Sequence, residues 1–232
     1  MREIILDTET TGLDPAKGDR LVEIGCVETL NQIPTGKEFH RYFNPQRDMP
    51  EGAFKVHGLS AEFLGDKPLF ETVAEAFLAF IGEARLVIHN AEFDMRFINA
   101  ELTRAGHGAI GNDRVLDTLA IARRKFPGAQ NSLDALADRF QVDRSKRDKH
   151  GALIDSLILA EVYLELSGGR QTTMALTAAP APRPRAAGES APLAARPIAL
   201  PPRLSEAERE AHAAFVKTLG KDAVWADYAK AE

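Results

Sequence analysis

The sequence predicts an α/β fold in which a mixed sheet carries helices on its faces. Three strand-like segments come first, and strands then alternate with helices, which is the pattern of such a layered fold. After residue 176 the composition changes abruptly to Ala and Pro, so we expect a flexible linker followed by a short C-terminal docking segment.

The first early strand is a short apolar run with β-branched residues, and two further strand candidates follow it. The three segments cover residues 3–10, 20–30 and 37–44, and the single cysteine, Cys26, lies in the apolar run of the second. The turn-rich segment 31–36 lies between the last two, which favours an antiparallel meander.

The later elements follow from hydrophobic spacing and from helix start and stop signals. In the helix at 131–140, Asn131 is the expected N-cap and Asp134 lies in the first turn. The predicted elements are a helix at 70–80, a strand at 85–90, a helix at 93–106, a strand at 114–116, and helices at 117–126, 131–140 and 151–166, the last ended by Gly168 and Gly169.

The chain thus divides into a folded domain at 1–169, an exit peptide at 170–176, a linker at 177–203 and a terminal segment at 204–232. The linker holds seven of the 13 prolines and no aromatic residue, so burial cannot offset its ordering entropy. No apolar run suits a signal peptide or approaches the roughly 20 residues needed to span a bilayer, which indicates a cytoplasmic protein without membrane contact. The net charge of −5 argues against nucleic-acid binding through phosphate neutralisation alone.

Asp7 and Glu9 lie two apart at the end of the first strand, so both carboxylates project from one face. Clustered carboxylates repel each other unless a hard cation such as Mg²⁺ or Mn²⁺ lies between them. With 34 acidic residues in the chain, a chance pair of solvated charges is the alternative interpretation.

Three further residues extend this pair. Asp94 follows a strand in the first turn of a helix, where it could equally serve only the helix dipole. Asp155 lies in a helix that is apolar nearly all round, where an ionised side chain is costly unless it is paired or metal-bound. His150 lies five residues earlier, at the entrance of that helix.

Hydrolysis of a phosphodiester by two metal ions requires such a set. In this interpretation Asp7 bridges both ions, Glu9 and Asp155 complete the ligation, and Asp94 acts directly or through water. Neutral His150 takes the proton of the attacking water as general base.

The segments DTETTGLD, HNAEFD and HGALIDS resemble the three motifs of the DEDDh 3′→5′ exonuclease superfamily, in order and spacing, across residues 1–168. The resemblance implies an RNase H-like fold, release of 3′-terminal nucleotides, and catalytic roles for the five residues above. KVHGLS, NSLDALADRF and ILAEVYLELSGG are more narrowly similar to the ε (proofreading) subunits of bacterial DNA polymerase III.

This likeness implies that His57 and Glu51 contact the terminal nucleotide, beside the metal-binding Asp7, Glu9 and Asp155. From the residues alone, His57 is a loop histidine. The turn at Thr10 to Gly12 could bring its backbone to the terminal base or could be a plain turn.

The tail carries partner motifs by the same resemblance. Gln171, Met174 and Leu176 are similar to a sliding-clamp-binding peptide, although chance matches to so short a motif are common. The terminal segment, with a candidate capping box at Ser205 and Glu208, is expected to bind the α (polymerase) subunit or to fold back on the domain. Its expected anchors are apolar or aromatic: Phe215, Leu219, Trp225 and Tyr228.

The leading hypothesis is therefore a proofreading subunit that acts on a single-stranded or frayed primer 3′ terminus, with the β clamp, the α subunit and a possible small accessory subunit as partners. An exoribonuclease that trims RNA and a non-catalytic replisome scaffold are the alternatives.

Overall fold

The computed structural model describes residues 1–145, 149–169 and 204–219. Contacts divide the chain into two units, Met1–Met174 and Ala175–Glu232, and each is described by itself. Gln171, Met174, Leu176, Trp225 and Tyr228, for which we predict partner contacts, lie outside the described residues.

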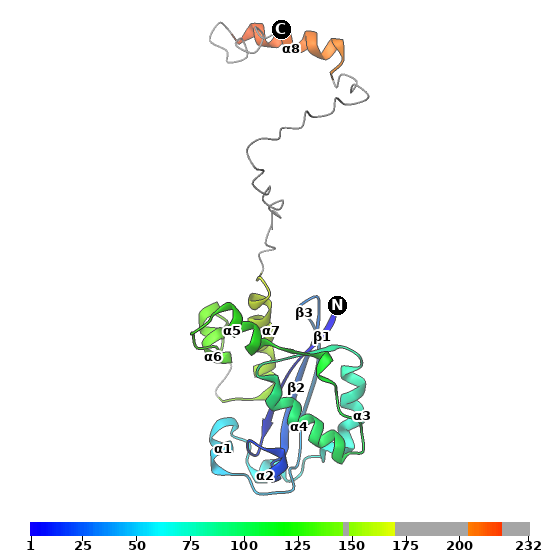
Figure 1. Ribbon diagram of the computed structural model, residues 1–232, viewed down its shortest axis with the longest axis vertical. Coiled ribbons are helices and arrows are strands. Elements are labelled where there is room, and N and C mark those ends of the chain that lie inside the picture. Colours follow the sequence, from blue (N-terminus) through cyan, green and yellow to red (C-terminus); the bar gives the residue numbers. More distant parts are fainter. Residues whose placement is uncertain (146–148, 170–203, 220–232) are drawn as a thin grey trace, which may run out of the picture. The chain divides into compact units, whose positions relative to one another are not determined.

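In the described part of the first unit, five strands form one mixed sheet in the order β3-β2-β1-β4-β5 (Figure 1). β2 pairs antiparallel with both β1 and β3, whereas β4 pairs parallel with both β1 and β5. The expected α/β fold with a mixed sheet is confirmed. The strands are β1 (Arg2–Thr10), β2 (Leu21–Leu30), β3 (Ile33–Tyr42), β4 (Arg85–Ile88) and β5 (Val115–Asp117).

The turn between β2 and β3 is shorter than predicted. Only Asn31 and Gln32 lie between the strands, and both have positive φ, 51° and 68°. Positive φ at both central residues of a two-residue hairpin loop matches the right-handed twist of the flanking strands. β3 begins at Ile33, so the prediction of a turn at 31–36 is wrong for residues 33–36.

Helices cover both faces of the sheet (Figure 1). Phe70, Phe77 and Phe97, from the two helices α3 and α4, pack with even-numbered β1 residues such as Ile4 in one buried core. The helices of this unit are α1 (Glu51–His57), α2 (Ala61–Leu64), α3 (Phe70–Ile81), α4 (Ala91–Arg104), α5 (Thr118–Lys125), α6 (Leu133–Phe140) and α7 (Ala152–Leu166), with short 3₁₀ turns at Pro15–Lys17 and Asn112–Arg114.

The opposite face of the sheet packs against α7. Ile5 of β1 and Val27 of β2 lie in one buried cluster with Leu159 and Tyr163 of this helix. Gly25, in the middle of β2, lies so close to α7 that a Cβ there would overlap the backbone of Ala152. The missing side chain lets the first turn of α7 rest directly on the sheet.

Two parts of the domain differ from the prediction. α1 and α2 are not predicted, and His57 lies at the end of α1 rather than in a loop. Ser132, not Asn131, is the N-cap of α6, because its hydroxyl accepts a hydrogen bond from the Ala135 amide at 3.2 Å. Asn131 is buried instead, and its side-chain amide donates to two carbonyls of the preceding turn.

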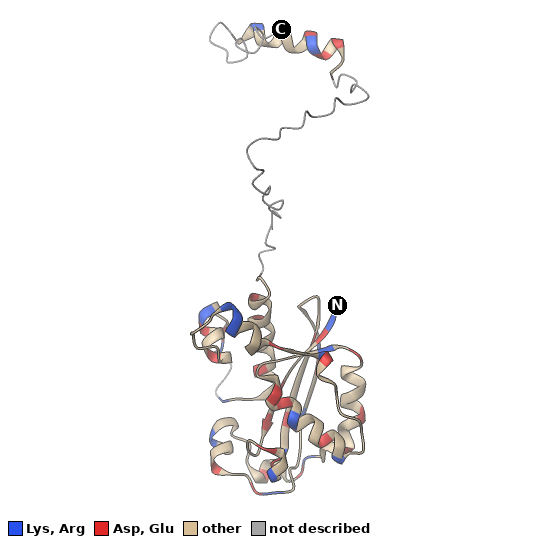
Figure 2. Cartoon of the chain, viewed as in Figure 1, with Lys and Arg blue, Asp and Glu red and all other residues tan. Residues whose placement is uncertain are grey.

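The described part of the second unit holds one helix, α8 (Glu206–Thr218). The predicted capping box is present, with the Ser205 hydroxyl accepting from the Glu208 amide and the Glu208 carboxylate accepting from the Ser205 amide at 2.8 Å. α8 carries charged side chains of both signs (Figure 2), and Phe215 is 60% exposed. No helix in the described ranges is long and apolar enough to cross a membrane.

Candidate active site

The side chains of Asp7 and Glu9 project from the end of β1 toward α7. Alternate residues of a strand point to the same face, so residues 5, 7 and 9 of β1 share one face, and Ile5 on this face packs on α7. Glu9 is buried, whereas Asp7 keeps part of its surface open. The two predicted carboxylates therefore share the face of the sheet that α7 covers.

α7 adds Asp155 and the residue that precedes the helix, His150. Asp155 lies in the first turn and is 3% exposed, while the His150 side chain is about half exposed. His150 Nδ1 lies 3.0 Å from Asp155 Oδ2. Gly25, which lies against the first turn of α7, is the cross-strand neighbour of Asp7. This contact therefore brings the helix that carries Asp155 close to the strand that carries Asp7.

Asp94 reaches the same strand end from the other face of the sheet. It lies in the first turn of α4, is 3% exposed, and its Oδ1 accepts a hydrogen bond from Thr8 Oγ1 at 2.6 Å. Because Thr8 lies between Asp7 and Glu9, this bond ties α4 to the strand that carries the first two acids.

The pKa values of two acids reflect this crowding. Burial, and then the negative charges of Asp94 and Glu9, raise the pKa of Asp7 well above its usual value, with Asp155 and Glu23 adding to the effect. Burial also raises the pKa of Asp94 to about 7, although hydrogen bonds from Thr8 oppose the shift. Neighbouring carboxylates that repel each other in this way are stabilised by a cation.

The residues present fit a bound metal ion. Glu9, His150 and Asp155 each offer one ligand atom, and these atoms lie within 4.8 Å of one another. Carboxylate oxygens are the ligands that Mg²⁺ and Mn²⁺ prefer, and Mn²⁺ also accepts an imidazole nitrogen.

Metal affinity should therefore depend on pH near neutrality. Binding needs ionised carboxylates, so the apparent affinity for Mn²⁺ should rise between pH 6 and 8, by up to about tenfold per pH unit for each proton released. The sign follows from Asp94, whose pKa of about 7 leaves it protonated in acid. Titration calorimetry at pH 7 in two buffers that differ in ionisation enthalpy measures the proton release, and an affinity that is constant from pH 6 to 8 would contradict this prediction.

A fifth carboxylate, Glu23, lies in the site and is not among the predicted residues. It pairs with Glu9 across β1 and β2, is 3% exposed, and its Oε1 lies 2.7 Å from His40 Nε2. The one feature of the sequence that points to Glu23 is its position as an acidic residue inside the apolar run LVEIGCV.

The predicted substrate residues differ in their environment. His57 is buried, its Nδ1 accepts from the Leu59 amide at 3.0 Å, and its Nε2 has no hydrogen-bond partner among the described residues. Burial lowers the pKa of His57, and the Thr10 backbone opposes this shift. Thr10 is buried at the end of β1, whereas Glu51 is exposed on α1 and pairs with Lys55 at 2.6 Å.

Residues 4–163 match the exonuclease family model RNase_T. The chain belongs to this exonuclease family. The match includes β2 to β5, β1 from residue 4 on, and all five predicted catalytic residues, so the exonuclease domain contains the whole acid cluster.

Relatives of the exonuclease domain carry more specific names. The chain is 57% identical over 176 residues to the DNA polymerase III subunit epsilon of Rickettsia prowazekii, covering 75% of this chain and 77% of that protein. It is 49% identical over 181 residues to the subunit of the same name from Escherichia coli K12, covering 75% and 74%.

Solved structures support the fold of the exonuclease domain. Exonuclease X in complex with 5′ overhanging duplex DNA matches with a TM-score of 0.57 and 26% identity, covering 71% of this chain and 90% of that one. The nuclease domain of 3′hExo, a DEDDh family member bound to rAMP, matches with a TM-score of 0.62, covering 72% and 92%. At 16% identity the second likeness concerns the fold alone, which is the RNase H-like fold that the sequence predicts.

Proposed function

We propose that this chain is the proofreading subunit of DNA polymerase III and removes nucleotides from DNA 3′ ends in the cytoplasm. The observation that carries the proposal is the gathering of acids and His150 at one strand end, on a chain 57% identical to a DNA polymerase III subunit epsilon. RNA trimming finds no such support, since the relatives at 49% and 57% identity carry the name of a DNA polymerase subunit.

The site would hold two divalent ions, Mg²⁺ or Mn²⁺. Asp7 is suited to bridge both because its carboxylate lies among the other acids and remains partly open. Glu9 and Asp155 would complete the ligation, with Asp94 acting directly or through water. When bound, the ions supply an activated water molecule and stabilise the charge that develops on the phosphate and the leaving 3′ oxygen.

His150 would act as the general base. In the neutral imidazole one nitrogen carries the proton and the other accepts one. If Nδ1–H donates to Asp155, the lone pair lies on Nε2 and can take a proton from water. The half-exposed position of His150 allows that proton to pass on to solvent.

The terminal nucleotide would lie between the turn after β1 and the end of α1. His57 Nε2 is a buried donor that a ligand oxygen would satisfy, and the Thr10 backbone lies beside it. Glu51 remains a predicted contact of the nucleotide. Its solvent-exposed ion pair with Lys55 would have to break when the nucleotide binds.

A primer with a 3′ mismatch tests the nuclease. With Mg²⁺ the full-length protein should release mononucleotides from the 3′ end, and EDTA should stop the release. An RNA strand of the same sequence distinguishes the exoribonuclease alternative, and a protein that releases nothing from either strand would be the non-catalytic scaffold.

The domain boundaries at 169, 176 and 203 and the partner contacts are proposals of the same kind. Phe215 of α8 and the C-cap residue Leu219 lie four residues apart and are 60% and 46% exposed, so the end of this helix presents two apolar side chains suited to a groove on the α subunit. Gln171, Met174 and Leu176 would bind the β clamp, Trp225 and Tyr228 would complete the contact with the α subunit, and a small accessory subunit could bind the exonuclease domain.

Truncation after Gly169 separates catalysis from docking. The truncated protein should keep its nuclease rate within about twofold, since the described core and the acid cluster precede this point. It should lose binding to the α subunit and to the clamp, which surface-immobilised partners measure. A full-length Phe215→Asp variant should lose binding to the α subunit and keep binding to the clamp. An unstable truncated domain would contradict the proposed boundary.

A further inference from the structure

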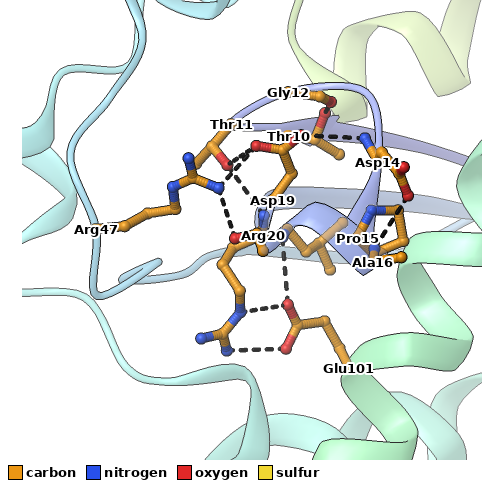
Figure 3. A network of polar contacts seen from close by, with 12 residues as sticks. Thr10, Thr11, Gly12, Asp14, Pro15, Ala16, Asp19, Arg20, Arg47 and Glu101 are labelled. Carbon is orange, nitrogen blue, oxygen red and sulfur yellow. Dashed lines mark hydrogen bonds and ion pairs between the residues drawn. The ribbon is translucent and has the colours of Figure 1, made fainter.

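A network of polar contacts fixes the turn that follows β1 (Figure 3). The turn joins Thr10, the last residue of β1, to Gly12, and Thr10 Oγ1 donates to the Gly12 carbonyl at 2.6 Å. Thr11 is fully buried; its amide donates to the Arg20 carbonyl at 2.9 Å, and its hydroxyl accepts from the Arg20 amide at 3.0 Å. The turn is thus bonded to the residue that precedes β2.

The Asp19 side chain stabilises the same turn by hydrogen bonds to Thr11 and Asp14. Its Oδ2 accepts from the Asp14 amide at 3.1 Å, and its Oδ1 accepts from Arg47 Nη1 at 2.7 Å and from Thr11 Oγ1 at 3.5 Å. Arg47 is itself held in place, because the same Nη1 donates to the Gly18 carbonyl at 2.5 Å. The Asp19 side chain is only 17% exposed, so its orientation is fixed on several sides.

The carboxylate of Asp19 fills the space in which a side chain at Gly12 would lie. A Cβ on Gly12 would overlap the Asp19 carboxylate, whose three terminal atoms are its nearest neighbours. The φ of Gly12 lies outside the left-handed region, so its backbone could carry a side chain without strain. The close approach of Asp19, and not the backbone conformation, therefore requires glycine here.

The network also reaches α4. Arg20 forms two hydrogen bonds with the fully buried carboxylate of Glu101, at 2.7 and 2.9 Å (Figure 3). α4 also carries Asp94, so the turn, the start of β2 and an acid of the active site are joined through buried contacts.

We infer that Asp19, held by Arg47, is a positioning residue that sets the place of the Thr10–Gly12 turn and so the binding of the 3′-terminal nucleotide. The inference rests on the proposed function, in which that nucleotide lies between this turn and His57. Asp19 does not touch the nucleotide; it fixes the backbone that does. Binding should therefore be affected more than the chemical step.

A double-mutant cycle between Gly12 and Asp19 tests this inference in the full-length protein. kcat and KM are measured on a single-stranded DNA 3′ end with Mn²⁺, together with the affinity for Mn²⁺. Gly12→Ala should raise KM roughly tenfold with little change in kcat, and Asp19→Ala about threefold, since a raised KM at unchanged kcat is the sign of lost ground-state binding. The affinity for Mn²⁺ should stay at the wild-type value.

The double variant decides the outcome. Removing the Asp19 carboxylate removes the atoms that a Gly12 side chain would meet, so Gly12→Ala should cost much less in the Asp19→Ala background. Arg47→Met, which releases Asp19 without removing it, should raise KM in the same direction, while Lys17→Ala in the same loop is the neutral control. Faster hydrogen exchange at the Thr11 amide in Asp19→Ala would report the loosened turn without reference to activity.

Equal penalties for Gly12→Ala with and without Asp19 would overturn the inference, as would Asp19→Ala and Arg47→Met proteins with wild-type KM. A wild-type protein that releases no nucleotide would contradict the proposed function instead, so the two failures are distinguishable.

Discussion

Asp7→Ala should abolish nucleotide release. The pKa of Asp7 is raised by burial and by every other carboxylate of the site, and in the proposed two-ion site its removal would leave the ions without their shared ligand. We expect a loss of kcat of at least about 10⁴-fold, measured in single-turnover assays with Mg²⁺ and Mn²⁺. Retention of more than a few per cent of the rate would contradict the bridging role.

The neutral variant Asp7→Asn should be just as inactive and yet more stable than the metal-free wild type. Because the pKa of Asp7 is higher in the folded than in the unfolded state, the folded state binds more protons between these two values. Ionisation of the Asp7 carboxyl group therefore lowers the free energy of unfolding of the metal-free protein as pH rises through this window. At pH 8 the Tm of Asp7→Asn should exceed that of the wild type in EDTA.

Exposed Asp48 provides the matched control. Asp48→Asn should leave Tm and rate unchanged, and saturating Mn²⁺ should raise the Tm of the wild type more than that of Asp7→Asn. A lower Tm for Asp7→Asn in EDTA would mean that the carboxylate stabilises the metal-free fold.

His150→Gln should keep the fold and lose roughly 10²–10⁴-fold in kcat, the usual contribution of a general base. The half-exposed ring makes no large contribution to the core, so Tm should change little. Rates are measured from pH 6 to 10 at saturating Mn²⁺, with His212→Gln on the exposed surface of α8 as control.

The pH profile distinguishes the roles of His150. If His150 is the general base, the pH profile of the wild-type rate and that of the variant should differ in shape as well as in height. A near-normal rate of His150→Gln at pH 8 would rule out the assigned role. If His150 instead binds the metal, the main loss would be in Mn²⁺ affinity, since its ring lies in the group that could hold an ion.

Much of the fold could be predicted because its core elements have strong periodic patterns. β1, β2 and the helices α3, α4 and α7 bury one face or nearly all of their surface, and the spacing of apolar residues records this directly. The two-residue turn at Asn31 and the short helices α1 and α2 could not be predicted in this way. Their conformations depend on backbone dihedral angles and on contacts with distant elements, which leave little periodic signal.

The residues of the candidate site likewise divide into those that the sequence pattern predicts and those that it does not. An Asp inside an apolar helix has to be explained by a partner, so Asp155 was visible in the sequence, and the structure gathers it with Glu9 and His150. Glu23 also interrupts an apolar run, but single polar residues are common in strands, so the pattern does not distinguish it. His57 could not be assigned from its neighbours, because its burial results from packing in α1.

The contact between Gly25 and α7 has a consequence for how sequence variation should be interpreted. Gly25 has no functional group, yet any side chain there would lift the N-terminal end of α7 off the sheet and carry His150 and Asp155 away from Asp7. Mutational tolerance at Gly25 should therefore resemble that of a metal ligand. A loss of proofreading mapped to this position would reflect the spacing between two halves of the catalytic centre rather than the loss of a reacting group.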